Sequence, residues 1–190
     1  MRIPYLDLKT NGRSATFISG ISGSGKSTMV RHMITQFRKL RKESKRKVIL
    51  LTQTQELDPV FSDVKNLLHI SINHDPHYME LETEHFKDAI LIADDFEGSA
   101  KDVIKFTSAL LKDILERSRK LSTDILIVTH LTQQQHFTRS IIHECDAYLL
   151  FPASNQNSAA RFLKAYLDAD KKQLEEMVEC EHQFDYLYIH

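Results

Sequence analysis

The apolar residues of this chain follow two alternating patterns. Some form short, largely apolar runs, and others return every three or four positions over longer stretches. A short apolar run bounded by polar residues is typical of a strand that is buried on both faces. Five runs predict such strands: residues 15–19, 47–52, 89–93, 124–129 and 147–151.

Weaker signals predict further strands. Residues 68–72 and 184–189 are apolar at most positions and short enough for a strand. The dipeptide Asn11-Gly12 favours a tight hairpin turn, so that residues 5–9 would form a short leading strand.

The longer stretches predict helices between the strands. One helical stripe runs from Val30 to Phe37, and a second begins at Val103. Residues 157–179 predict one or two more helices. Buried strands that alternate with helices indicate an α/β fold, in which a mostly parallel central sheet is covered by helices on both faces. Ligands of such sheets bind at the carboxyl ends of the strands.

The length and the cysteine content narrow the class of protein. A chain of 190 residues suits one domain, residues 1–190, with a sizeable core. The apolar runs are too short to span a bilayer, and the first residues lack the apolar segment of a signal peptide. Cys145 and Cys180 make no disulfide framework, and we expect Cys145 to be a buried thiol. These features predict an intracellular protein with no membrane partner.

A glycine-rich segment connects the first predicted strand to the first predicted helix. Residues 20–28 read GISGSGKST and fit the pattern G-x-x-x-x-G-K-[ST], in which backbone N–H groups cradle nucleotide phosphates. Lys26 would reach the β- and γ-phosphates, which makes it a catalytic candidate, and the Ser27 hydroxyl would ligate Mg²⁺. The segment therefore predicts ATP and Mg²⁺ as cofactors. Its candidate binding residues are Gly20, Ser22, Gly23, Ser24, Gly25, Lys26, Ser27 and Thr28.

Two carboxylates, Asp94 and Asp95, follow the apolar run at 89–93. We expect Asp94 to hold Mg²⁺ together with Ser27. Asp95 is the candidate for the base that polarises an attacking water, and Glu97 is its rival. The acids predict that the bound nucleotide is hydrolysed.

The following predicted strand ends in Thr129 and His130. Polar groups at this place would lie beside the γ-phosphate and detect its loss. Ordinary capping of a strand end accounts for the same residues. Both are therefore candidates for sensing and catalysis, with that alternative open.

Seven of the ten residues at 38–47 are lysine or arginine. Such a run can contact nucleic-acid phosphates. A solvated helix end, where cations complement the helix dipole, accounts for it equally well. Because the sequence contains no separate recognition module, we expect any DNA contact to be with phosphates.

The ordered motifs resemble the FtsK/HerA superfamily of DNA-pumping ATPases. Within it, the chain is similar to the poxvirus-type genome-packaging ATPases of large DNA viruses, virophages and related elements. The resemblance covers roughly residues 13–170 and implies a three-layer P-loop NTPase of RecA/FtsK-like architecture. It is carried by the phosphate loop, by Asp94-Asp95 after its strand, by Arg117-Ser118-Arg119-Lys120 before the strand that ends in Thr129-His130, and by Thr138-Arg139-Ser140 before the run at 147–151.

The resemblance implies a ring of subunits that hydrolyse ATP and translocate double-stranded DNA into a capsid. An arginine of one subunit would reach the γ-phosphate of its neighbour, and Arg119 and Arg139 are the two candidates. The implied partners are DNA, further copies of the chain and a capsid protein, in the host cytoplasm or virus factory and at the capsid vertex. His130 and Asp95 depart from the family, where Gln or Asn and Glu are commoner.

Two other functions fit the phosphate loop. A small nucleoside or polynucleotide kinase shares it, but such kinases usually carry an arginine-rich lid that we do not find in the sequence. A nucleotide-gated adaptor would bind a partner, for example through the acidic carboxyl-terminal segment, and would hydrolyse little ATP.

Overall fold

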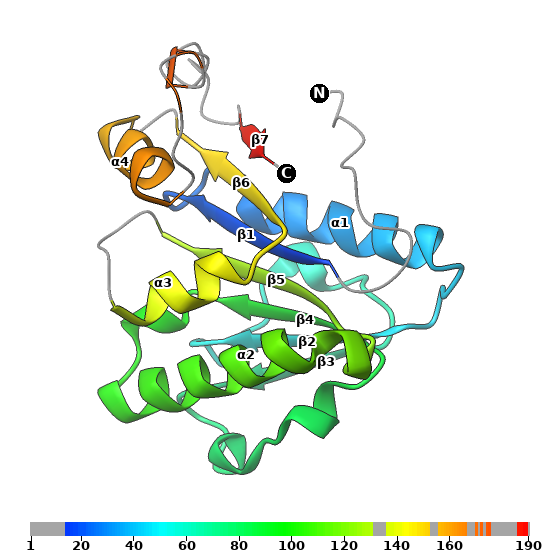
Figure 1. Cartoon of the computed structure of the whole chain (residues 1–190). Coiled ribbons are helices and arrows are strands. Elements are labelled where there is room, and N and C mark those ends of the chain that lie inside the picture. Colours follow the sequence, from blue (N-terminus) through cyan, green and yellow to red (C-terminus); the bar gives the residue numbers. More distant parts are fainter. Residues whose placement is uncertain are drawn as a thin grey trace.

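Strands and helices alternate along the chain in the computed structural model and build a seven-stranded sheet flanked by helices (Figure 1). The structure describes residues 14–130, 136–152, 156–166, 170, 172, 174–175 and 186–189. The strands are β1 (Ala15–Gly20), β2 (Lys47–Thr52), β3 (Leu67–Ser71), β4 (Ala89–Asp94), β5 (Asp124–Thr129), β6 (Ala147–Phe151) and β7 (Leu187–Ile189). The helices are α1 (Lys26–Leu40), α2 (Lys101–Leu121), α3 (His136–His143) and α4 (Gln156–Tyr166). Short 3₁₀ turns are η1 (Pro59–Phe61), η2 (Tyr78–Glu80), η3 (Thr83–Phe86) and η4 (Phe96–Gly98).

The strand order decides which residues meet at the carboxyl edge of the sheet. The order is β3-β2-β4-β5-β1-β6-β7, and neighbouring strands are parallel except for β6 and β7. β5 therefore separates β1, which leads into the phosphate loop, from β4, which leads into the acids. The register places Ser19 beside Thr129 and Asp94 beside Val128. The ends of all three strands lie together.

Each face of the sheet has its own apolar core. In β4, Leu91 and Ala93 belong to the core under α2, α3 and α4, whereas Ile90 and Ile92 belong to the core under α1. This period of two is what a strand buried on both faces requires. The helices therefore cover both faces, with α1 alone on one of them in the described part of the chain.

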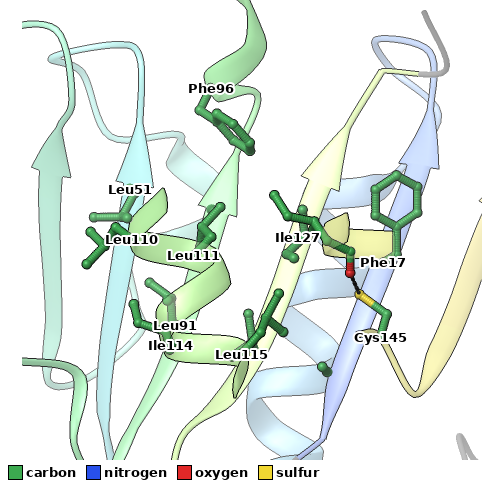
Figure 2. Close-up of a cluster of buried hydrophobic side chains, with 14 of the residues drawn as sticks. Phe17, Leu51, Leu91, Phe96, Leu110, Leu111, Ile114, Leu115, Ile127 and Cys145 are labelled. Carbon is green, nitrogen blue, oxygen red and sulfur yellow. Dashed lines mark hydrogen bonds between the residues drawn. The ribbon is translucent and has the colours of Figure 1, made fainter. Parts of the chain in front are cut away.

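The α2 face shows why this helix forms where it does. Leu110, Leu111, Ile114 and Leu115 recur at helical spacing and pack over the inner strands (Figure 2). Cys145 lies in the same core, and its thiol donates to the Ile141 carbonyl oxygen at 3.3 Å. The expected burial of this cysteine is confirmed.

A buried carboxylate stabilises the opposite end of the sheet, where the parallel strands begin. Asp124 is fully buried at the start of β5. It pairs with Arg41, with an N–O distance of 2.9 Å, and with Arg46. The Ser14 backbone N–H donates to its Oδ1 atom at 2.7 Å. The carboxylate of Asp124 thus connects the start of β5 to the residue before β1 and to the segment that joins α1 to β2.

The basic run at 38–47 is divided between the fold and the surface. Arg41 and Arg46 form ion pairs with Asp124, and the Arg38 guanidinium donates to two backbone carbonyls. Other cations of the run are exposed: Lys39, Lys42 and Lys45.

The predicted core strands are confirmed, with small shifts at their ends. The strand predicted at 68–72 begins one residue earlier, and the one predicted at 184–189 is the short antiparallel β7. The sequence did not predict α3, which has only eight residues. The leading strand at 5–9, the Asn11-Gly12 turn and Cys180 lie outside the described residues. No helix in the described part of the chain is long and apolar enough to cross a membrane.

Candidate nucleotide-hydrolysis site

The phosphate loop connects the last residue of β1, Gly20, to the first residue of α1, Lys26. Gly23 and Gly25 have φ angles of 77° and 95°, a left-handed conformation that side chains disfavour. A Cβ atom at Gly20 would come within 2.7 Å of both Phe151 Cβ and Ser24 Oγ. The glycines of the motif are therefore required by the path of the backbone itself.

Lys26 folds back along the loop. Its Nζ atom donates to the carbonyl oxygens of Gly20 and Ile21, both at 2.8 Å, and only 8% of the residue is exposed. Burial lowers the pKa of Lys26, while the charges of Asp94 and Asp95 act in the opposite direction. The ammonium group is thus held where the loop and the acids meet.

The residues of the loop fit a bound phosphate chain. The first turn of α1 contains no acidic side chain, so its N–H groups and dipole present a positive end. The Ser24 hydroxyl is buried and has no hydrogen-bond partner among the described residues. Buried hydroxyls normally have partners, and an oxygen-rich ligand in the loop would supply one. Ser27, on the first turn, and Asp94 are the residues that would hold Mg²⁺ beside it, whereas Ser22 and Thr28 are exposed.

Asp94 ends β4 in a setting that disfavours its charge. Burial and the neighbouring Asp95 raise its pKa to about 6, against the opposing charges of Lys26 and His130. A cation bound at this carboxylate would offset that cost, because an opposite charge favours the ionised form.

Asp95 adopts a left-handed backbone conformation with φ 51°. Its N–H donates to the Val128 carbonyl at 3.0 Å, and its Oδ2 atom lies 3.3 Å from His130 Nε2. The side chain remains 44% exposed, so water can reach it. Asp95 is thus anchored to β5 while its carboxylate faces the solvent side of the site.

Glu97 lies deeper, in η4. The Thr129 hydroxyl donates to its Oε2 atom, and burial raises the pKa of Glu97 while this hydrogen bond lowers it. The two residues proposed as sensors, Thr129 and His130, therefore each contact one of the two candidate bases. The Thr129 hydroxyl also donates to the neighbouring His130 carbonyl oxygen at 3.1 Å, a local contact of the kind that the capping alternative describes.

Of the two candidate arginines, Arg119 lies away from this cluster. Arg119 is exposed near the end of α2, which leads into the start of β5, at the sheet edge opposite the phosphate loop. It lines a pocket there with Arg41, Glu43, Arg46, Asp88 and Ser122. Arg139 lies in α3, and its side chain is outside the described residues. Arg119 therefore belongs to a different surface from the loop of its own subunit.

Sequence reasoning missed one residue of the cluster, Gln53. It directly follows β2, and its Nε2 atom donates to the Asp95 carbonyl oxygen. Its place in the sequence could have indicated it, because Gln53 is a polar residue directly after a buried strand, and this strand lies beside β4.

The fold and the loop define the class of protein: this chain has the fold of a P-loop NTPase in which one strand separates the phosphate-loop strand from the acid strand. No protein-family profile matches the chain. Protein V3 of the Sputnik virophage, itself uncharacterised, is 28% identical over 175 residues, which cover 90% of this chain and 69% of V3.

Solved structures share the fold. The genome packaging NTPase B204 of Sulfolobus turreted icosahedral virus 2, in complex with ATP-γS, matches with a TM-score of 0.59 at 16% identity, over 95% of this chain and 92% of B204. The cytoplasmic domain of the type VII secretion ATPase EccC of Thermomonospora curvata matches with a TM-score of 0.60 at 11% identity, over 82% of this chain and 22% of EccC. The expected three-layer fold is confirmed, and at the level of the fold so is the resemblance to packaging ATPases.

Proposed function

We propose that this chain is an ATP-hydrolysing motor that translocates double-stranded DNA, and that it packages a viral genome. The observation that carries the proposal is the meeting of Lys26 with Asp94 and Asp95 across the end of β5. A phosphate cradle beside two carboxylates is suited to hydrolysis. The fold shared with B204, a genome packaging NTPase, supports the biological setting.

Each residue of the cluster has a defined role in this proposal. The loop N–H groups and Lys26 bind the β- and γ-phosphates, and Ser27 and Asp94 hold Mg²⁺, which neutralises charge on those phosphates when bound. Asp95 is the base, because its carboxylate is exposed to water and lies close enough to Lys26 for its charge to act on the ammonium group, as that of Asp94 does. His130 orients Asp95. The Thr129 hydroxyl holds the carboxylate of Glu97, the rival base.

We expect Asp95→Asn to lower kcat by about 10²- to 10⁴-fold, the usual contribution of a general base, with ATP binding retained. Glu97→Gln, its matched counterpart, should lower kcat less, because Glu97 is half-buried and its Oε2 atom already accepts a hydrogen bond from the Thr129 hydroxyl. Steady-state turnover and titration with a fluorescent ATP analogue measure both effects. A larger loss in Glu97→Gln would assign the base to Glu97.

The proposed partners are double-stranded DNA, other copies of the chain and a capsid protein. DNA phosphates would contact the exposed lysines of the basic run, Lys39, Lys42 and Lys45. The arginines of the run instead make ion pairs and hydrogen bonds within the fold. In a ring, the sheet edge that carries Arg119 would face the phosphate loop of the next subunit. The protein would work as one domain, in the cytoplasm or virus factory and at the capsid vertex.

The proposal predicts that double-stranded DNA stimulates ATP turnover and that the protein forms a closed oligomer with nucleotide. Turnover with and without DNA over a salt series, beside native mass spectrometry, measures both. Stimulation should fade as salt rises, because the contacts are with phosphates. A monomer whose turnover ignores DNA would contradict the motor, and transfer of labelled γ-phosphate to a nucleoside or DNA end would establish the kinase instead.

A further inference from the structure

The loop that carries the proposed base is held by a residue from outside the phosphate-loop and acid motifs. Gln53 follows β2, and its carboxamide nitrogen donates to the backbone carbonyl oxygen of Asp95. The backbone of Gln53 is itself fixed, since its carbonyl accepts from the Ser71 hydroxyl at 3.3 Å. Gln53 thus connects the ends of β2 and β3 to the acid loop, residues 95–98.

The same carboxamide packs on the far end of the acid loop. A Cβ atom at Gly98 would lie 2.9 Å from Gln53 Nε2 and 3.2 Å from its Oε1 atom. Glycine at this position therefore leaves the space that the Gln53 carboxamide fills. One side chain contacts both the first and the last residue of the loop, which contains both candidate bases.

The backbone of the acid loop needs such support. Asp95 is a non-glycine residue at φ 51°, a left-handed conformation that aspartate tolerates better than most residues but that still benefits from support by its surroundings. Its N–H is held by Val128, and its carbonyl is held by Gln53. Releasing the carbonyl would free the peptide to rotate, and the Asp95 carboxylate would move away from His130 and from the loop.

We propose that Gln53 is a positioning residue, which holds the acid loop so that the carboxylate of Asp95 faces the attacking water. The role rests on the proposed hydrolysis of ATP. Gln53 does not touch the nucleotide in this proposal and acts through Asp95. Loss of the carboxamide therefore lowers kcat and leaves the KM for ATP close to that of the wild type, because the phosphate loop is unchanged.

The test compares Gln53→Ala with Gln55→Ala, an exposed glutamine two residues further along the same segment. Gln53→Ala should lower kcat by about 10- to 100-fold, as expected for a misplaced catalytic group, whereas Gln55→Ala should have no effect. Gln53→Glu keeps the size but turns an acceptor toward the Asp95 carbonyl, so it should be at least as impaired. Equal kcat values in all variants, or a matching rise in KM, would overturn the proposal.

A double-mutant cycle separates positioning from general destabilisation. As a single substitution, Gly98→Ala should displace the Gln53 carboxamide and lower kcat. When added to Gln53→Ala, it should lower kcat no further, because the space beside position 98 is then free. Additive losses would contradict a shared role.

Hydrogen exchange provides a measurement that does not depend on turnover. The amides of Asp95 and Ser99 are hydrogen-bonded in the acid loop. They should exchange faster in Gln53→Ala than in Gln55→Ala, even if the protein proved to hydrolyse no ATP. Unchanged exchange would refute the positioning role, whereas absent turnover with faster exchange would refute only the proposed function.

Discussion

Replacing Lys26 with alanine is expected to remove ATP hydrolysis, with a fall in kcat of at least about 10²- to 10³-fold, the usual effect of deleting one donor to a developing charge. The ammonium group is buried in the loop, donates to the Gly20 and Ile21 carbonyls, and interacts with the charges of both acids. Nothing else in the described part of the loop carries a positive side chain. Turnover of ATP with and without DNA measures the effect.

Lys112→Ala is the control for this substitution. Lys112 is exposed on α2 and pairs with Glu116, one turn along the same helix. Its removal should leave turnover unchanged. If Lys26→Ala kept the turnover of the wild type and altered only the binding of a partner, the nucleotide-gated adaptor would replace the motor as the best description.

Replacing Asp124 with alanine is expected to lower the free energy of unfolding by about 3–5 kcal/mol, the cost of removing one partner from a buried ion pair. The carboxylate is fully buried, and it accepts from Arg41, Arg46 and the Ser14 backbone N–H. Without it, the mostly buried Arg46 keeps its charge but loses its buried acidic partner, and the exposed Glu43 is the acid that still pairs with it among the described residues. Urea unfolding followed by circular dichroism measures the change.

Asp63→Ala provides the matched comparison, because Asp63 also pairs with an arginine, Arg31, but at the surface. Both partners are well exposed there, so its loss should be close to the error of the measurement. Equal stability of the two variants would show that the Asp124 cluster is not a determinant of the fold.

The sequence predicts the core strands and the phosphate loop well, because their signals are local. An apolar run flanked by polar residues defines β4 by itself, and Lys26 follows from the spacing of glycines. The order of strands is not local. That β5 separates β1 from β4, and thereby brings Thr129 to Glu97, depends on packing across the whole sheet.

The basic run shows the limit of composition as a guide. Seven cations in ten positions suggest one surface, yet Arg41 and Arg46 point to Asp124, which lies about eighty residues further along the chain. A contact over that separation leaves no periodic trace. Gln53 was missed for the same reason, since only the pairing of β2 with β4 brings it to Asp95.

The left-handed backbone at Asp95 also bears on how this position can vary among related proteins. Aspartate, asparagine and glycine tolerate such a conformation more readily than longer side chains do. A protein that keeps this turn and a carboxylate at this position should therefore favour the short acid, since glutamate would be less readily accommodated in the left-handed conformation. Because the Gln53 carboxamide contacts the Asp95 carbonyl and occupies the space beside Gly98, we expect positions 53, 95 and 98 to change together among proteins that share this turn.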